Sequence, residues 1–141
     1  MPTIRYYSTN RNLDAVAGLT PFKGHVSFRD ALIQGQAPDE GLFMPEPIPA
    51  LSLEDILALK GAPYAQTALL VAEAFLKDDL PREAIKEIVE DSYNFDVPLE
   101  RVFDRMVVMR LDRGPTASFK DFAARMMARL MSRLRARGKR L

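Results

Sequence analysis

The sequence predicts a mostly helical domain of the α+β or α/β class with a few short strands. Apolar residues recur at helical spacing in several segments that start after a capping serine or aspartate and end at glycine or proline. The β-favouring runs are short and bounded by turn residues. A chain of 141 residues, 48% of them apolar, is long enough for one ordinary domain with a buried core.

The first part of the chain contains a strand, a short helix and an extended segment. Residues 4–8 favour a strand and lead into a polar turn, so we expect an edge strand. Ser27 is placed to cap a short helix over residues 28–34, which Gly35 would end. Residues 42–45 should be extended, because proline and the residue before it avoid the helical region.

Three helices should follow and pack against one another. They cover residues 53–59, residues 64–75 and a segment that starts after Asp79 with Pro81 in its first turn. The middle helix is apolar over much of its circumference, so we expect it to be buried. The third carries an acidic outer face that is typical of a solvated surface.

Composition excludes several kinds of site. Because the chain has no cysteine, it can form no disulfide and no thiolate metal site, and we expect no metal. It also lacks a long apolar segment, so we expect a cytoplasmic protein that does not contact a membrane. The only histidine, His25, lies near a loop, where histidines are more often exposed than catalytic.

The positive charge is concentrated at the end of the chain. Residues 120–141 hold eight Lys or Arg and one Asp, against 12 and 18 in residues 1–119. A helix from Ser118 to about Arg137 should carry a row of four arginines, Arg125, Arg129, Arg133 and Arg137. Because like charges at this spacing repel, something acidic should lie opposite, or water should screen them. No aromatic residue interleaves the row, so we do not expect nucleic acid as a partner.

A strand-to-helix turn precedes this helix. Met106–Met109 is an apolar run of strand length, and Gly114-Pro115 breaks the chain before the helical period starts. Ser118 and Asp121 have the spacing of a capping box, in which each side chain can satisfy a backbone N–H. Lys120 would therefore lie in the first helical turn.

A lysine at this position is suited to forming a covalent bond with a ligand. The N-terminal end of a helix favours anions over an ammonium group, so Lys120 should release its proton more readily. A neutral amine is what a Schiff-base lysine needs, and a phosphate group would be stabilised at the same helix end. The alternative is that Lys120 points into water and the capping box is only a cap.

Two motifs resemble one enzyme family. Gly114-Pro115-Thr116-x-x-Phe119-Lys120-Asp121-Phe122 resembles the lysine motif of the threonine synthases, pyridoxal 5'-phosphate enzymes of the fold-type II group. A second stretch resembles the N-terminal signature of these enzymes. It consists of Tyr7-Ser8-Thr9, followed by Val26-Ser27-Phe28-x-x-Ala31-Leu32-x-x-Gly35-x-Ala37-Pro38-Asp39-x-Gly41-Leu42-Phe43-x-Pro45. The resemblance implies that Lys120 carries pyridoxal 5'-phosphate as a Schiff base.

The resemblance also implies a reaction and a substrate. Threonine synthases convert O-phospho-L-homoserine and water into L-threonine and phosphate. Lys120, released as an amine, would move protons between carbon atoms of the substrate. Thr116 and Ser118 are placed to offer hydroxyls to an anionic substrate group, although Ser118 could be fully used as a cap.

The similarity spans residues 5–130, which matches only the N-terminal part of such an enzyme. The resemblance implies that residues 1–105 form an N-terminal helical domain with an edge strand, and that residues 106–141 start the pyridoxal-phosphate-binding α/β domain. The family's glycine-rich phosphate loop and its ring contacts come later in the chain. We therefore expect an N-terminal part that is inactive alone and binds the cofactor weakly or not at all.

Two positions depart from the family pattern, and two alternatives stay open. Arg113 stands where many members have histidine, and Glu40 stands where glycine is usual. A threonine-synthase-like phospho-lyase would share both motifs and differ in its product. A non-catalytic interaction module could retain the same N-terminal fold. The sequence does not indicate an oligomeric state.

Overall fold

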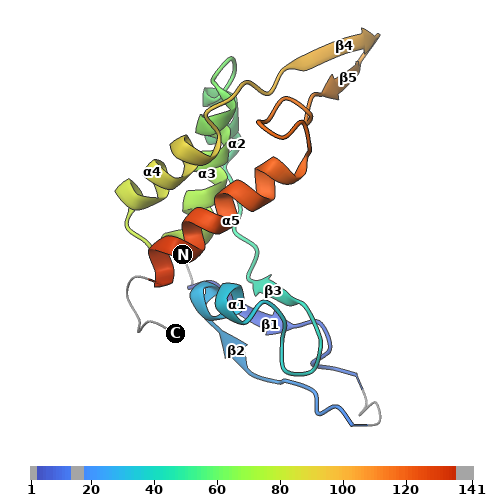
Figure 1. Cartoon of the computed structure of the whole chain (residues 1–141), viewed down its shortest axis with the longest axis vertical. Helices are drawn as coiled ribbons and strands as arrows, with labels where there is room; N and C mark the ends of the chain where they lie inside the picture. Colours follow the sequence, from blue (N-terminus) through green and yellow to red (C-terminus); the bar gives the residue numbers. More distant parts are fainter. Residues whose placement is uncertain (1–2, 14–17, 136–141) are drawn as a thin grey trace. The chain divides into compact units, whose positions relative to one another are not determined.

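The computed structural model describes residues 3–13 and 18–135 (Figure 1). The chain divides into two compact units. The first unit comprises Met1–Ala50 and Ala74–Pro81, and the second comprises Leu51–Glu73 and Arg82–Leu141. Each unit has its own buried side chains, so each is described separately.

The first unit contains a three-stranded antiparallel sheet. Its strands are β1 (Arg5–Ser8), β2 (His25–Val26) and β3 (Phe43–Glu46), in the order β2-β1-β3. The predicted edge position of the first strand is wrong, because β1 is the central strand. Its neighbours were hard to recognise, since β2 has two residues and β3 contains Pro45, which lacks an N–H and is tolerated only in an edge strand.

Helix α1 (Phe28–Gln34) covers this sheet and forms as predicted. The Ser27 hydroxyl accepts a hydrogen bond from the Asp30 backbone N–H at 3.1 Å, and Gly35 ends the helix with a φ of 75°. The small core of the unit is a cluster of apolar side chains from the sheet and this helix. It comprises Ile4, Tyr6 and Ala31, with Val26, Phe28, Phe43 and Phe75 packed against them.

A buried carboxylate organises the loop that precedes β3. Asp39 is 2% exposed, and its side chain accepts hydrogen bonds from the Ser8 hydroxyl at 2.6 Å, Phe22 N at 2.8 Å and Gly41 N at 3.1 Å. Burial opposes the charged form, but these three donors lower the pKa of Asp39 below its ordinary value. Glu40, beside it, has a φ of 60°. The family's usual glycine at that position fits this left-handed conformation without strain.

His25 is exposed in β2, as expected of a histidine without a buried role. Its Nε2 lies 3.1 Å from Glu46 Oε2, and Arg11 Nη1 lies 3.0 Å from the same oxygen. The hydrogen bond from Arg11, followed by that from His25, lowers the pKa of Glu46 to about 2. The three side chains tie β2 and the loop after β1 to the end of β3.

The second unit is helical. Its helices are α2 (Leu53–Ala58), α3 (Tyr64–Leu76, whose last turn belongs to the first unit), α4 (Arg82–Ser92) and α5 (Lys120–Arg135). Helix α4 buries Ala84, Ile85, Ile88 and Val89, and α5 buries Leu130 and Leu134. None of the described helices is long and apolar enough to cross a membrane.

The expected packing of the three middle helices holds only in part, since Glu73 on α3 forms an ion pair with Arg82 on α4. Helix α2 buries no side chain, and Val71 on α3 is 42% exposed. The main packing of α4 is against α5, which starts about thirty residues later in the sequence. Helical periodicity identifies an apolar stripe but does not say which later segment covers it.

An exposed β-hairpin connects α4 to the turn before α5. It consists of β4 (Leu99–Phe103) and β5 (Met106–Met109). The sequence predicted β5 but missed β4. Every residue of both strands is exposed, including Phe103 at 62% and Val107 at 55%.

Candidate functional site

The turn between β5 and α5 presents Lys120 at the start of a helix. Residues 110–119 form this turn, and Lys120 is the first residue of α5. The predicted strand, turn and helix are therefore confirmed in order, although the helix begins two residues later than expected. Arg137, the last residue of the expected helix, lies outside the described part of the chain.

Asp121 fixes the shape of the turn. It is 5% exposed, and its two carboxylate oxygens accept hydrogen bonds from Thr116 N at 2.8 Å and from the Thr116 hydroxyl at 2.9 Å. Gly114 lies against the same side chain, since a Cβ at that position would lie 2.8 Å from Asp121 Cβ. The carboxylate thus folds the Gly-Pro-Thr segment back onto the first helical turn.

The predicted capping box does not form. Asp121 turns to Thr116 and not to the backbone of Ser118, and the Ser118 hydroxyl accepts from Lys120 N at 3.3 Å instead of from Asp121 N. Asp121 N donates to the Ser118 carbonyl at 3.0 Å. Ala117, with a φ of 54°, makes the tight bend that produces this arrangement. Sequence spacing identified the right residues but the wrong pairing.

Lys120, Thr116 and Ser118 lie together in this one turn. The Lys120 side chain is exposed, and among the described residues none forms a hydrogen bond or ion pair with its amine. The Thr116 hydroxyl donates its proton to Asp121 and keeps its lone pairs. The roles expected of Thr116 and Ser118 in substrate binding stay predictions.

Arg110 joins the turn to the hairpin, and sequence reasoning missed it. Its guanidinium contacts Asp112 through Nε and Nη2, at 2.7 and 2.6 Å, and Glu100 on β4 through Nη1, at 2.6 Å. The hydrogen bonds from Arg110 lower the pKa of Asp112 to about 2. The Arg-x-Asp spacing was the available signal, but Glu100 lies on the strand that the sequence did not reveal.

A cavity lies beside the same turn. Its volume is about 460 Å³, and Arg113 lines it together with the aromatic side chains of Tyr64, Tyr93 and Phe95. Arg113 is the residue that replaces the family's usual histidine. Its exposed guanidinium gives this wall of the cavity a positive charge.

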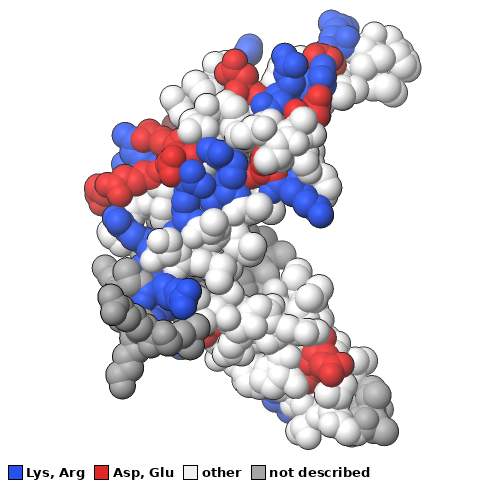
Figure 2. Space-filling view, in the orientation of Figure 1, with Lys and Arg blue, Asp and Glu red and all other residues white. Residues whose placement is uncertain are grey.

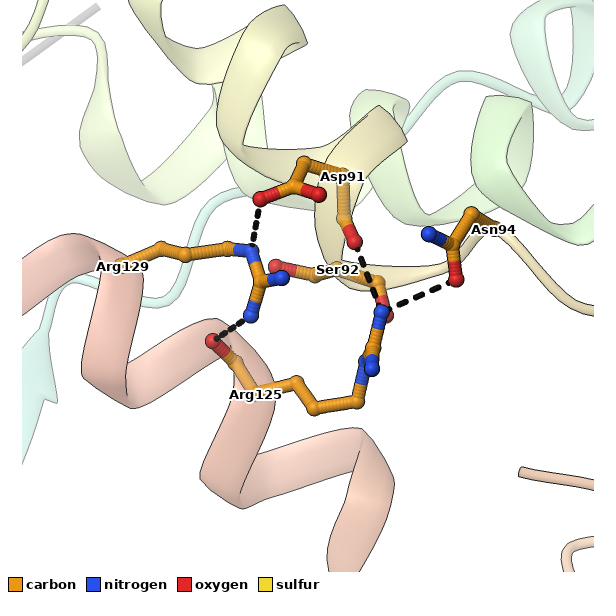
Figure 3. Close-up of polar contacts among 5 residues, drawn as sticks. All are labelled: Asp91, Ser92, Asn94, Arg125 and Arg129. Carbon is orange, nitrogen blue, oxygen red and sulfur yellow. Dashed lines mark hydrogen bonds and ion pairs between the residues drawn. The ribbon is translucent and has the colours of Figure 1, made fainter. Parts of the chain in front are cut away.

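The arginine row is paired within the second unit. Arg129 forms an ion pair with Asp91, and Arg133 Nη2 lies 3.0 Å from Glu87 Oε2 (Figure 3 shows the first pair). Arg125 donates to backbone carbonyls at the end of α4. Figure 2 shows positive and negative side chains interleaved over this part of the surface. The prediction of an acidic surface opposite the row is confirmed for Arg129 and Arg133, whereas Arg125 contacts carbonyl and amide oxygens instead of a carboxylate.

Comparison with known proteins identifies the family of the chain. Residues 5–93 match the family described as threonine synthase N terminus. The chain belongs to the threonine synthase family. Threonine synthase of Haemophilus influenzae is 35% identical over 115 residues, which cover 81% of this chain and 26% of that protein. Threonine synthase of Pseudomonas aeruginosa is 33% identical over 98% of this chain and 29% of its own length.

A solved threonine synthase has a similar fold. The enzyme from Brucella melitensis, whose structure contains bound pyridoxal phosphate, is 32% identical and matches with a TM-score of 0.82. The match covers 95% of this chain and 28% of that enzyme. The chain therefore spans less than a third of the length of the threonine synthases that it matches. The family serves threonine biosynthesis.

Proposed function

We propose that this chain supplies the cofactor-attachment lysine and the N-terminal region of a fold-type II threonine synthase that converts O-phospho-L-homoserine and water into L-threonine and phosphate. The observation that carries the proposal is the exposed Lys120 amine, which no described residue engages, at the start of α5. Membership in the threonine synthase family and the pyridoxal phosphate in the Brucella melitensis relative support it.

The residues of the turn fit a covalently attached cofactor. Lys120 Nζ is accessible, and the fixed Gly-Pro-Thr segment beside it leaves that amine free to react. Pyridoxal phosphate, when bound, would supply an electron sink that makes a carbon next to the substrate nitrogen acidic. Lys120 would hold the group through Nζ and, when released, carry protons to and from the substrate carbons.

The neighbouring residues would then position Lys120 and the substrate. Asp121 holds the turn closed through Thr116, and the Ser118 hydroxyl contacts the backbone of Lys120. The lone pairs of both hydroxyls stay available to a donor group, and the hydroxyl of Ser118 can rotate toward an anion. Few other cofactor contacts would come from this chain, so 141 residues alone should bind the cofactor weakly.

We further propose that residues 106–141 begin the cofactor-binding α/β domain and that residues 1–105 form the N-terminal domain. The exposure of β5 supports this assignment, and the boundary then falls in the tight turn between the paired strands β4 and β5. Met106–Met109 is a continuous apolar run, which is typical of a strand covered on both faces, yet each of its residues is exposed. A two-stranded hairpin of this kind is marginal in water without further packing.

A chimaeric enzyme tests the proposal. Residues 1–141 would replace the matched 28% of the Brucella melitensis threonine synthase, and the product would be assayed with O-phospho-L-homoserine. We expect threonine and phosphate, and we expect borohydride to fix pyridoxal phosphate on Lys120. The Lys120→Ala chimaera should lose the visible absorption band, whereas Lys60→Ala, at an exposed lysine on another segment, should keep it.

Two results would contradict the proposal. The first is fixation of the cofactor on a different lysine, or on none, in a chimaera whose circular dichroism matches that of the parent enzyme. The second is formation of a keto acid instead of threonine, which would assign the chain to a phospho-lyase. Because both results are read from the loaded protein, the parent enzyme serves as the positive control.

A further inference from the structure

The N-terminal part of α5 is held from one side by the end of α4. Helix α4 ends at Ser92, and its last carbonyl groups have no partner within the helix. Arg125 Nε donates to the Ser92 carbonyl at 2.7 Å, and Nη2 donates to the Asp91 carbonyl at 2.9 Å (Figure 3). The same Nη2 lies 2.9 Å from Asn94 Oδ1. One guanidinium therefore caps α4 and fastens α5 to it.

The position and the charge of the Arg125 guanidinium both strengthen this contact. A cation at the carbonyl end of a helix is stabilised by the helix dipole. The guanidinium also lies over the ring of Phe95, with 5.8 Å between its carbon and the ring centroid. Hydrogen bonds from a charged donor to carbonyl groups that lack another partner contribute more than ordinary surface ion pairs.

A second, independent contact holds the first turn of α5. The Tyr93 hydroxyl, just past the end of α4, donates to the Phe122 carbonyl at 3.0 Å. The Phe122 ring packs among Tyr64, Tyr93 and Phe95, with ring centroids 5.4 to 6.0 Å apart. Phe122 lies two residues after Lys120. The aromatic cluster thus fixes the backbone directly beside the amine.

Helical geometry relates these contacts to Lys120. Arg125 lies five residues after Lys120, which is about 7.5 Å along the axis and about 140° around it. When Arg125 faces the end of α4, Lys120 therefore projects away from α4, in agreement with its exposure. Rotation of α5 about its own axis would change the direction of the Lys120 side chain, and Arg125 and Tyr93 oppose that rotation.

We propose that Arg125 and Tyr93 are positioning residues, which set the direction in which α5 presents the Lys120 amine to the cofactor. This inference rests on the proposed function of Lys120. Tyr93 donates to a backbone carbonyl of α5, and Arg125 joins α5 to the backbone of α4, so both act on Lys120 through the backbone of α5. Arg129 and Arg133 lie further along the helix and pair with side chains of α4, which makes them a weaker constraint on the first turn.

A distance measurement on the 141-residue chain tests the positioning role without any cofactor. Since the chain has no cysteine, Lys120→Cys and Glu83→Cys allow two spin labels to be placed on α5 and α4 alone. We expect Arg125→Met to widen the distribution of label distances about twofold, because only the Tyr93 hydrogen bond and the packing of Phe122 then hold the start of the helix. Arg125→Lys should reverse less than about half of this widening, because one ammonium group cannot donate to both carbonyls with the geometry of a planar guanidinium.

Arg133→Met is the matched control. It removes the same charge from the same helix, but its partner is the exposed Glu87 side chain, so the distribution should keep its width. Tyr93→Phe keeps the ring and removes the second contact, and it should also widen the distribution. If Arg125→Met loses its helical circular dichroism, the width measured in Tyr93→Phe is the test of the positioning role. Unchanged widths in Arg125→Met, or in Tyr93→Phe if the first variant does not fold, would overturn the proposal.

The same variants in the chimaera separate the two proposals. We expect Arg125→Met to slow borohydride-trappable attachment at Lys120 about tenfold and Arg133→Met to leave it unchanged, because only the first releases the turn. If the original protein attaches the cofactor at another lysine while the label distances still depend on Arg125, the proposed function fails and the positioning role stands. If attachment at Lys120 and the distances are both insensitive to Arg125, the positioning role fails alone.

Discussion

Single residues in this chain show how far local sequence determines backbone conformation. Gly35 ends α1 and Ser27 begins it, and both were predictable because capping depends on adjacent residues. Asp121 was recognised as important, but its partner was not, because a carboxylate can reach back to position 116 as readily as to position 118. Tight turns allow several pairings at the same spacing, and only packing selects one.

Gly114 should not tolerate a side chain. In the Gly114→Ala variant the added methyl would press on Asp121 Cβ, which lies close to the α5 backbone and cannot easily move. We expect a loss of about 1–3 kcal/mol in the free energy of unfolding, measured by urea titration. Ala117→Gly, in the same turn but at a φ of 54°, should be neutral or stabilising. Equal destabilisation by both variants would show that the turn is insensitive to the Asp121 contact.

Glu40 carries strain that glycine would relieve. Its φ of 60° is unfavourable for a residue with a Cβ, but glycine adds entropy to the unfolded chain. We expect Glu40→Gly to raise the free energy of unfolding by up to about 1 kcal/mol. Glu54→Gly, within helix α2, should lower it by roughly the same amount. A drop in both variants would mean that residue 40 relaxes at no energetic cost.

At the scale of elements, local helices were predictable and their neighbours were not. Residues 28–34, 53–59 and 64–75 were identified within one or two positions, because caps and periodicity are local signals. The pairing of α4 with α5 depends on contacts between residues more than thirty positions apart. The strand β4 escaped recognition because its apolar residues do not alternate with a buried face.

The β4–β5 hairpin should make the isolated chain self-associate. Its exposed apolar side chains form a continuous surface that water solvates poorly. We expect the double variant Phe103→Ser, Val107→Thr to reduce light scattering and dye binding, while the free energy of unfolding stays within about 0.5 kcal/mol. Leu130→Ala, at a buried position on α5, should instead lower that free energy by about 2–5 kcal/mol. Scattering that is unchanged in the double variant would place the associating surface elsewhere.

At the scale of the whole molecule, both units should lose stability in alkaline solution. Burial, with the negative charge of Asp79, raises the pKa of Tyr6 in the first unit to about 12, and burial raises the pKa of Tyr64 in the second. Each phenol ionises more readily when the chain is unfolded. The contribution of these phenols to the free energy of unfolding is therefore complete below pH 10 and is lost as the pH rises toward 12.

Urea titrations between pH 9 and pH 12 would measure this loss. Tyr6→Phe and Tyr64→Phe should each flatten the decline, because phenylalanine removes the ionisable group and keeps the ring. A decline that is equally steep in both variants would assign it to other groups, such as Tyr93, whose pKa burial also raises. Parallel transitions followed by near-ultraviolet and far-ultraviolet signals would show whether the units unfold together.

The packing of Gly41 restricts which sequences this loop can accept. A Cβ at that position would collide with the Ser8 hydroxyl and approach Asn10 N to 3.0 Å. In a saturation library scored for folded protein, position 41 should accept glycine alone, while the neighbouring position 40 should accept many residues. Designers who graft this loop onto another scaffold would have to transfer the Ser8, Asp39 and Gly41 positions as one indivisible set.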